Sequence, residues 1–153
     1  MRARFICGLQ LLAALLILSS SPRPTSACVC SGAKQPPCVA FREASAVFAG
    51  VVMDIIDAPF QPGDVFHQVF LRFKVEQVYK GVSDAQVQIA TITGTDCDFN
   101  LQKGESYFVY AYNDSRHNRL GTGTCTRTSR LMSAEEDLSY ALAFNGHSLA
   151  PSI

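Results

Sequence analysis

The sequence predicts a mainly β domain, in which five short antiparallel strands form a small barrel with flanking helices, stapled by disulfides. Three observations favour this class. Runs rich in β-branched and aromatic residues are separated by clusters of glycine, proline, aspartate and asparagine. One run alternates apolar and polar residues, as a half-buried strand does. Five cysteines follow an N-terminal export signal, which is typical of a disulfide framework.

Residues 1–27 have the three parts of a secretory signal peptide. Two arginines come first, residues 9–18 form an almost entirely apolar run, and residues 25–27 are the small residues Thr-Ser-Ala. The run is too short for a membrane-spanning helix, which needs about 20 apolar residues. Cleavage would make Cys28 the first residue of a secreted, extracellular protein. A bacterial lipoprotein signal, which would attach lipid to Cys28, stays open as the alternative.

The mature chain has the size and charge of one ordinary domain. Cleavage leaves 126 of the 153 residues, and we expect a domain over residues 28–144 and a flexible tail over residues 145–153. Three arginines leave with the signal, so ten Lys and Arg remain against thirteen Asp and Glu, a net charge of −3. This balance gives no electrostatic footprint for nucleic acid or for an anionic membrane.

Five segments have the character of strands. They are expected at residues 46–56, from Leu71 to a turn at residues 79–81, and at residues 87–93, 107–112 and 120–126. Gly50 in the first segment predicts a bulge or a close approach of another backbone. In the second, Leu71, Phe73 and Val75 alternate with charged residues, so one face should be buried.

Two helices should flank the strands. A short one is expected over residues 39–44. A longer one should begin after Ser133, because Ser133 and Glu136 have the spacing of a capping box, in which each side chain bonds a free amide of the first turn. The apolar stripe expected to face the barrel comprises Leu138, Ala141 and Leu142.

The mature chain has an odd number of cysteines, namely Cys28, Cys30, Cys38, Cys97 and Cys125. Two of the early three could bond the late two, each closing a loop of about 70 to 95 residues, worth roughly 4 to 5 kcal/mol before any strain. The fifth thiol would then be free or paired between chains. A zinc site on the early cluster remains an alternative, although C-x-x-C spacing is missing.

No enzyme motif is present. The chain has no nucleophile elbow or phosphate loop, and its three histidines have no metal-binding spacing. A redox role for the Cys28 and Cys30 pair would require both to be reducible and exposed. We therefore expect no enzymatic activity and no cofactor of the protein's own. Asn113 begins an Asn-Asp-Ser glycosylation sequon in an expected hairpin loop.

Several short strings in order resemble the N-terminal domain of the tissue inhibitors of metalloproteinases (TIMPs), within the netrin-like (NTR) superfamily. They are Cys28-Val29-Cys30, Phe48-Ala49-Gly50-Val51, Tyr79-Lys80-Gly81, Cys97, Tyr107-Phe108-Val109-Tyr110-Ala111 and Cys125. The resemblance covers residues 28 to about 144. It implies a five-stranded barrel of the oligonucleotide/oligosaccharide-binding (OB) type. It also implies the disulfides Cys28–Cys97 and Cys30–Cys125, which leave Cys38 unpaired.

The family resemblance implies an inhibitor of secreted, matrix-metalloproteinase-like zinc proteases. Such proteases hold zinc with three ligands and leave one position open for water. The α-amine and carbonyl oxygen of Cys28 would fill that position, so the only metal contacted would be the zinc of the target. An α-amine has an ordinary pKa of about 7.7 to 8, so its deprotonation costs little near neutral pH.

The same resemblance implies the contact surface. Val29 would enter the pocket beside the zinc, where most members carry Thr or Ser, so selectivity should differ. Further contacts are expected from Cys30, Ser31, Gly32, Thr95, Asp96 and Cys97, together with the loop at residues 57–64. We expect a monomer unless Cys38 pairs between chains. The alternative function is an NTR-type extracellular binding module without protease inhibition.

Overall fold

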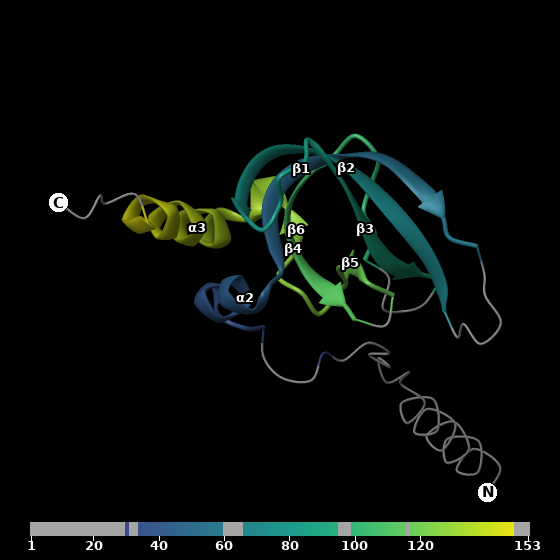
Figure 1. Ribbon diagram of the computed structural model, residues 1–153, viewed down its shortest axis with the longest axis horizontal. Coiled ribbons are helices and arrows are strands. Elements are labelled where there is room, and N and C mark those ends of the chain that lie inside the picture. The colour runs from purple at the N-terminus through teal and green to yellow at the C-terminus, as the bar shows by residue number, and fades with distance from the viewer. Residues whose placement is uncertain (1–29, 31–33, 60–65, 95–98, 116, 149–153) are drawn as a thin grey trace, which may run out of the picture.

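A computed structural model shows a closed β-barrel with two helices outside it (Figure 1). It describes residue 30 and residues 34–59, 66–94, 99–115 and 117–148. The elements are α2 (Pro37–Glu43), β1 (Ala46–Asp57), β2 (His67–Lys80), β3 (Gln86–Thr93), β4 (Ser106–Asp114), β5 (Arg119–Gly121), β6 (Ser129–Arg130), a 3-10 turn η1 (Leu131–Ser133) and α3 (Glu135–Ser148).

The strands pair in the order β1-β2-β3-β5-β4, and β4 pairs with β1 to close the barrel, while β6 adds to β4 outside the ring. This arrangement confirms the mainly β, five-stranded barrel and broadly fits the OB fold. The prediction of an all-antiparallel barrel was wrong at one seam, because β3 and β5 pair in parallel through Ala90 and Gly121.

The first two strands follow the sequence pattern closely. Leu71 and Phe73 are buried inside the barrel, while Arg72 and Lys74 between and after them are exposed. Gly50 lies at an irregularity in the β1–β2 register, and a Cβ at this position would lie 2.6 Å from the carbonyl oxygen of Lys74. The predicted close approach at Gly50 is therefore confirmed. It lets the long β1 strand bend and pair with both β2 and β4.

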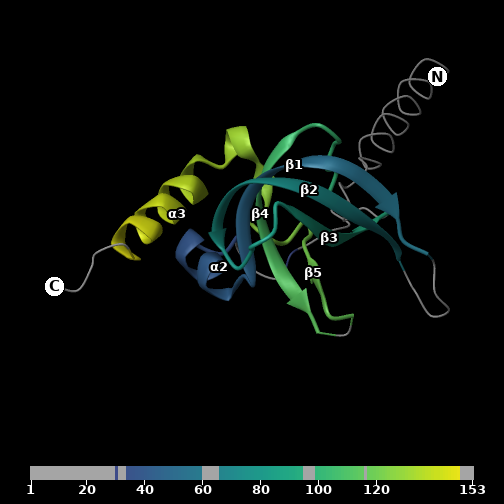
Figure 2. The same cartoon turned by 45° about the horizontal axis from the view of Figure 1, so that its top comes forward.

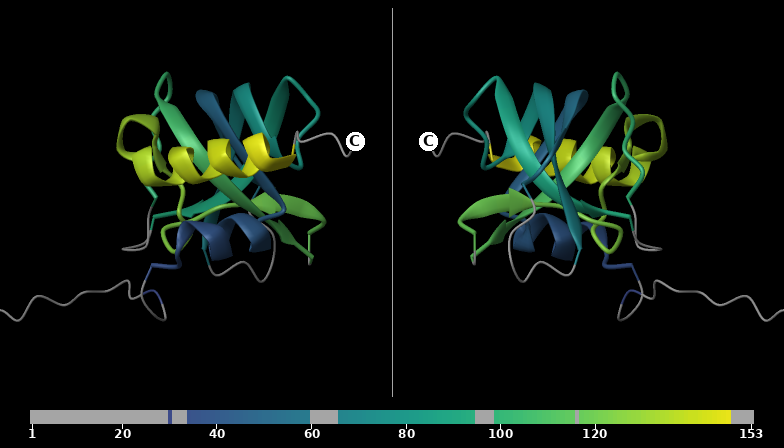
Figure 3. Two further views of the ribbon diagram at one scale, coloured as in Figure 1. Left: turned by 90° about the vertical axis from the view of Figure 1, so that its left-hand side faces the viewer. Right: turned by 90° about the vertical axis from the view of Figure 1, so that its right-hand side faces the viewer.

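Two hydrophobic clusters share the barrel wall. The inner one fills the barrel around Phe48, Phe73 and Tyr107, whose rings meet edge to face. The outer one packs the opposite face of β1 and β4 against α2 and α3. Both helices lie on this outer side of the barrel (Figures 2 and 3). Because it is covered on both faces, the start of β1 is buried at every position from Ala46 to Gly50.

The fifth strand is shorter than predicted. It covers Arg119–Gly121, whereas the expectation was residues 120–126. After Gly121, threonine hydroxyls bond backbone carbonyls: Thr122 Oγ1 donates to the Tyr110 carbonyl and Thr126 Oγ1 donates to the Gly123 carbonyl. Side-chain bonds of this kind compete with a strand ladder for the same backbone groups.

The last helix also differs from its prediction. It begins at Glu135, and the Glu136 carboxylate accepts a hydrogen bond from Arg127, so the Ser133–Glu136 capping box was wrong. Ala141 is buried and Leu138 partly buried, but Leu142 is 57% exposed and does not belong to the packed stripe. The helix continues to Ser148, four residues into the expected tail.

Asn113 of the sequon lies within β4, opposite Leu120 of β5, rather than in the hairpin loop that was expected. Its side chain is exposed. The helices of the described ranges are all too short or too polar to cross a lipid bilayer.

Candidate functional site

Of the predicted contact surface, the structure describes Cys30 and the first three residues of the loop 57–64. Cys30 forms a disulfide with Cys125, with 5.4 Å between the two Cα atoms, as the resemblance implied. The other predicted contact residues and Cys28 lie outside the described residues, as does the Cys28–Cys97 disulfide. Cys38 is exposed on α2 and is the one free cysteine in the part of the chain that the structure describes.

The segments that lead into the predicted contact loops end on one side of the barrel. Asp57 at the end of β1 pairs with Val69, and His67 at the start of β2 pairs with Thr93 at the end of β3. The loop 57–64 and the approach to Cys97 therefore leave the sheet at neighbouring positions. These strand ends point away from α3 (Figures 1 and 2).

A shallow hollow of about 380 Å³ connects these strand ends to the disulfide. Cys125, Gln68 and Ile92 are among the residues that line it. Arg119 also lines it: its guanidinium lies 5.2 Å from the ring centre of Phe70, donates to the Gln68 amide oxygen and lies near the Asp114 carboxylate. The hollow thus borders the point at which the N-terminal segment is bonded to the barrel.

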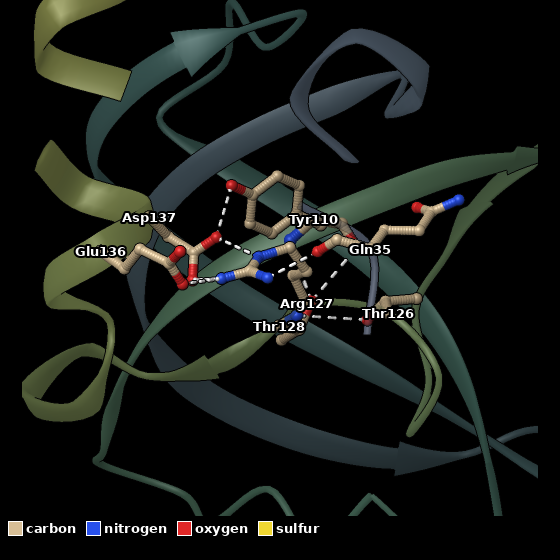
Figure 4. A network of polar contacts seen from close by, with 7 residues as sticks. All are labelled: Gln35, Tyr110, Thr126, Arg127, Thr128, Glu136 and Asp137. Carbon is tan, nitrogen blue, oxygen red and sulfur yellow. Dashed lines mark hydrogen bonds and ion pairs between the residues drawn. The ribbon is translucent and has the colours of Figure 1, made fainter. Parts of the chain in front are cut away.

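A second attachment of the N-terminal segment lies deeper in the molecule. Arg127, two residues after Cys125, donates from Nη1 to the main-chain carbonyl oxygen of Gln35 at 2.6 Å. Its Nε donates to Asp137 Oδ1 at 2.5 Å, and its Nη2 donates to Asp137 Oδ2 at 3.0 Å. Nη2 also donates to Glu136 Oε2 at 2.6 Å. One guanidinium therefore joins the N-terminal segment to helix α3 (Figure 4).

This polar network is largely shielded from water. Arg127 is 5% exposed and Asp137 is 3% exposed, whereas the Glu136 side chain is 72% exposed. The Tyr110 hydroxyl donates to Asp137 Oδ1 at 2.8 Å, so the buried carboxylate is bonded from two elements. A buried ion pair is stable only when its hydrogen bonds are satisfied in this way, because desolvation of each charge costs several kcal/mol.

The network also shifts proton affinities. The hydrogen bond to Asp137 is the main cause that raises the pKa of Arg127 above its ordinary value, outweighing the opposite effect of burial. Burial raises the pKa of the Tyr110 phenol, and its hydrogen bond to the Asp137 carboxylate raises it further. The arginine stays charged and the phenol stays neutral, so the network keeps one arrangement through the neutral range.

A third feature lies on the helical side. Lys80 Nζ donates to three carbonyl oxygens at the end of α2, those of Phe41, Arg42 and Ala44, at 2.6 to 2.9 Å. A positive charge at a helix C-terminus is stabilising. The next residue, Gly81, has a φ of +67°, and a Cβ there would lie 2.1 Å from the Ser45 carbonyl oxygen. Lys80 and Gly81 thus have structural roles at the turn.

The described residues include no group of three or more His, Cys, Asp or Glu side chains placed to hold one metal ion. Sequence reasoning missed the network around Arg127. The available signal was weak: Arg127 is the single charged residue in a run of glycine, threonine, serine and cysteine from residue 121 to 129. Its partner Asp137 lies in the first turn of α3, where acidic residues are common, so nothing in the sequence marks it.

No protein-family model matches the chain, and no curated protein matches it.

Proposed function

We propose that the protein is a secreted, extracellular inhibitor of zinc metalloendopeptidases. In this proposal Cys28 is the mature N-terminus, and its α-amine and carbonyl oxygen bind the zinc of the protease in place of the catalytic water. The protein is then not an enzyme and has no cofactor of its own. Its partners are secreted proteases of the matrix metalloproteinase kind.

The observation that carries the proposal is the double attachment of the segment that follows Cys28. Cys30 is bonded to Cys125, and the Gln35 carbonyl is bonded to Arg127. A chain terminus that binds a metal through its backbone must be held in place, because the ordering cost otherwise reduces affinity. The strand ends next to this segment also lead into the loops that the family resemblance assigns to the protease contact.

The zinc-binding role of the amine can be tested by adding one residue. The secreted mature protein and a variant with one alanine before Cys28 are titrated against the catalytic domain of a matrix-metalloproteinase-like zinc protease. A matched control carries the alanine after Ile153. We expect the N-terminal addition to weaken inhibition by roughly a hundredfold or more, since chelation of the metal is lost, and the control to inhibit fully.

Equal inhibition by the two alanine variants would contradict chelation. If neither they nor the wild-type protein inhibited any zinc protease, the alternative of an NTR-type binding module would be favoured. A lipidated or otherwise blocked Cys28 amine in the secreted protein would favour the same alternative. Intact-mass and N-terminal analysis of the secreted form identifies that group directly.

A further inference from the structure

We infer that Arg127 is a positioning residue for the N-terminal segment: through the Gln35 carbonyl it orients the chain that leads to Cys30 and Cys28. The inference rests on the proposed function and adds a residue that no sequence motif marks. It concerns the network of Gln35, Tyr110, Arg127 and Asp137, which we call the arginine clamp (Figure 4). Glu136 is a further, exposed partner of Arg127 and is not counted in the clamp.

Two attachments constrain the N-terminal segment more than one does. A single disulfide fixes the position of Cys30 but leaves the chain free to turn about the bonds of the bridge. A second attachment five residues later, at Gln35, restricts this freedom. Cys125 and Arg127, the two residues that supply the attachments, are only two residues apart. One short segment of the barrel therefore holds the N-terminal segment at two places.

The hydrogen bonds of the clamp hold the guanidinium in one orientation. The guanidinium donates to both oxygens of Asp137, and this two-bond arrangement sets its plane as well as its position. Asp137 is held in turn by the Tyr110 hydroxyl from β4. The Tyr110 amide and carbonyl are both bonded to Thr128 Oγ1, next to Arg127 in the chain. The Nη1 atom therefore presents its hydrogen to the Gln35 carbonyl from a fixed direction.

The buried position of the clamp excludes other roles. Arg127 and Asp137 are too buried to meet a partner, and each of the three guanidinium nitrogens already donates a hydrogen bond within the molecule. Stability alone does not require the bond to Gln35, because Asp137 and Glu136 already neutralise the arginine. The bond to Gln35 is the contact that reaches outside the barrel and helix α3. Positioning of the N-terminal segment is what this contact adds.

The test separates positioning from folding with three variants. Arg127→Met removes the clamp but leaves Asp137 buried and unpaired. Arg127→Met/Asp137→Leu removes both charges, and replacing a buried ion pair by apolar residues often costs little stability. Glu136→Gln is the matched control, since it changes an exposed partner of the same guanidinium and leaves the bonds to Asp137 and Gln35 in place.

Two readouts are measured at a temperature at which each variant is folded. The first is the rate of trypsin cleavage after the exposed Lys34, followed by mass spectrometry after reduction. It reports local release of the segment and needs no protease target. The second is the inhibition constant against the zinc protease. We expect the single and the double variant to be cleaved about tenfold faster and to inhibit about tenfold less tightly. Glu136→Gln should match the wild type in both.

The combination with the alanine extension gives a further check. In a protein that already carries alanine before Cys28, loss of the clamp should cause no additional loss of inhibition, because the oriented amine is no longer used. The inference would be overturned if the stable double variant had the same rate of cleavage after Lys34 and the same inhibition constant as the wild type. Faster cleavage with unchanged inhibition would also overturn it, since the clamp would then hold the segment without serving the amine.

The failure of the proposed function would look different. If the wild-type protein inhibited no zinc protease, the proposed function would fail. The rate of trypsin cleavage after Lys34 would still test whether the clamp holds the N-terminal segment. Faster cleavage in both clamp variants, but not in Glu136→Gln, would support it. Unchanged cleavage in the stable double variant would overturn it.

Discussion

The N-terminal segment is attached to the barrel in two contrasting ways. Cys30 and Cys125 are 95 residues apart in sequence, and Gln35 and Arg127 are 92 apart, so both attachments close almost the same loop. The first is covalent and lies at the surface, where Cys125 is exposed. The second is polar and buried, with Arg127 only 5% exposed.

This contrast shows how burial and bond type depend on one another. A disulfide holds the chain without help from its surroundings, so it can lie in contact with water. A hydrogen bond to a charged guanidinium is weakened by water and becomes specific only when water is excluded and every partner is satisfied. The buried attachment therefore needs Tyr110 and Asp137 as well as Arg127, and its loss would affect the fold as well as the segment.

Removal of the disulfide should have the largest effect. We expect Cys30→Ala/Cys125→Ala to lower the free energy of unfolding by about 4 kcal/mol, because the bridge closes a loop of 95 residues in the unfolded chain. Urea unfolding followed by circular dichroism measures the change. Cys38→Ala is the control, and as an exposed free thiol it should change stability by less than about 0.5 kcal/mol. If the wild type, the double variant and the Cys38→Ala control had the same free energy of unfolding, the disulfide would not be a stabilising attachment.

Loss of the arginine alone should come next. We expect Arg127→Met to lower the free energy of unfolding by about 3 kcal/mol, because Asp137 would be left as a buried, unpaired charge. The same urea unfolding measures it. Arg130→Met is a suitable control, because the Arg130 side chain is 46% exposed and pairs with Glu105 at the surface, where an ion pair contributes at most about 1 kcal/mol. If Arg127→Met and Arg130→Met lost the same free energy of unfolding, the buried network would stabilise the fold no more than an exposed ion pair does.

The smallest effect should be the contribution of Tyr110 to the pH dependence of stability. Folding raises the pKa of Tyr110 above its ordinary value of 10.0, chiefly through burial. The folded state then holds the phenol proton more tightly than the unfolded chain. This contribution to stability is full below about pH 10 and is lost as the pH rises further, by at most about 1.4 kcal/mol per pH unit.

The burial of Tyr79, Tyr107 and Tyr112 acts in the same direction, so the wild-type protein should lose stability steadily above pH 10. Urea unfolding between pH 8 and 11, with Cys38 alkylated to prevent disulfide exchange, measures this loss. The Tyr110→Phe variant should show a shallower decline. An identical slope in the variant would mean that Tyr110 does not contribute.

The difference between the two attachments also explains what the sequence could predict. The barrel strands follow from local patterns, since Leu71 and Phe73 alternate with charged neighbours and are buried as expected. The Cys30–Cys125 bond followed from the resemblance. The clamp could not be predicted, because Arg127 and Asp137 are brought together only by tertiary packing. The same pair explains the one error in the predicted helix stripe, since Asp137 points inward and Leu142 then turns toward solvent.

The proposed contact between the backbone of Cys28 and the zinc of a target protease can be observed at the metal itself, in a cobalt-substituted protease. Cobalt(II) replaces zinc and reports its ligands through its visible absorption spectrum. We predict that the mature protein changes this spectrum on binding, because an amine nitrogen and a carbonyl oxygen replace water at the metal. The protein with alanine before Cys28 should leave the spectrum unchanged. If the cobalt protease had the same spectrum with the mature protein and with the alanine-extended protein, although the mature protein inhibits it, Cys28 would not bind the metal.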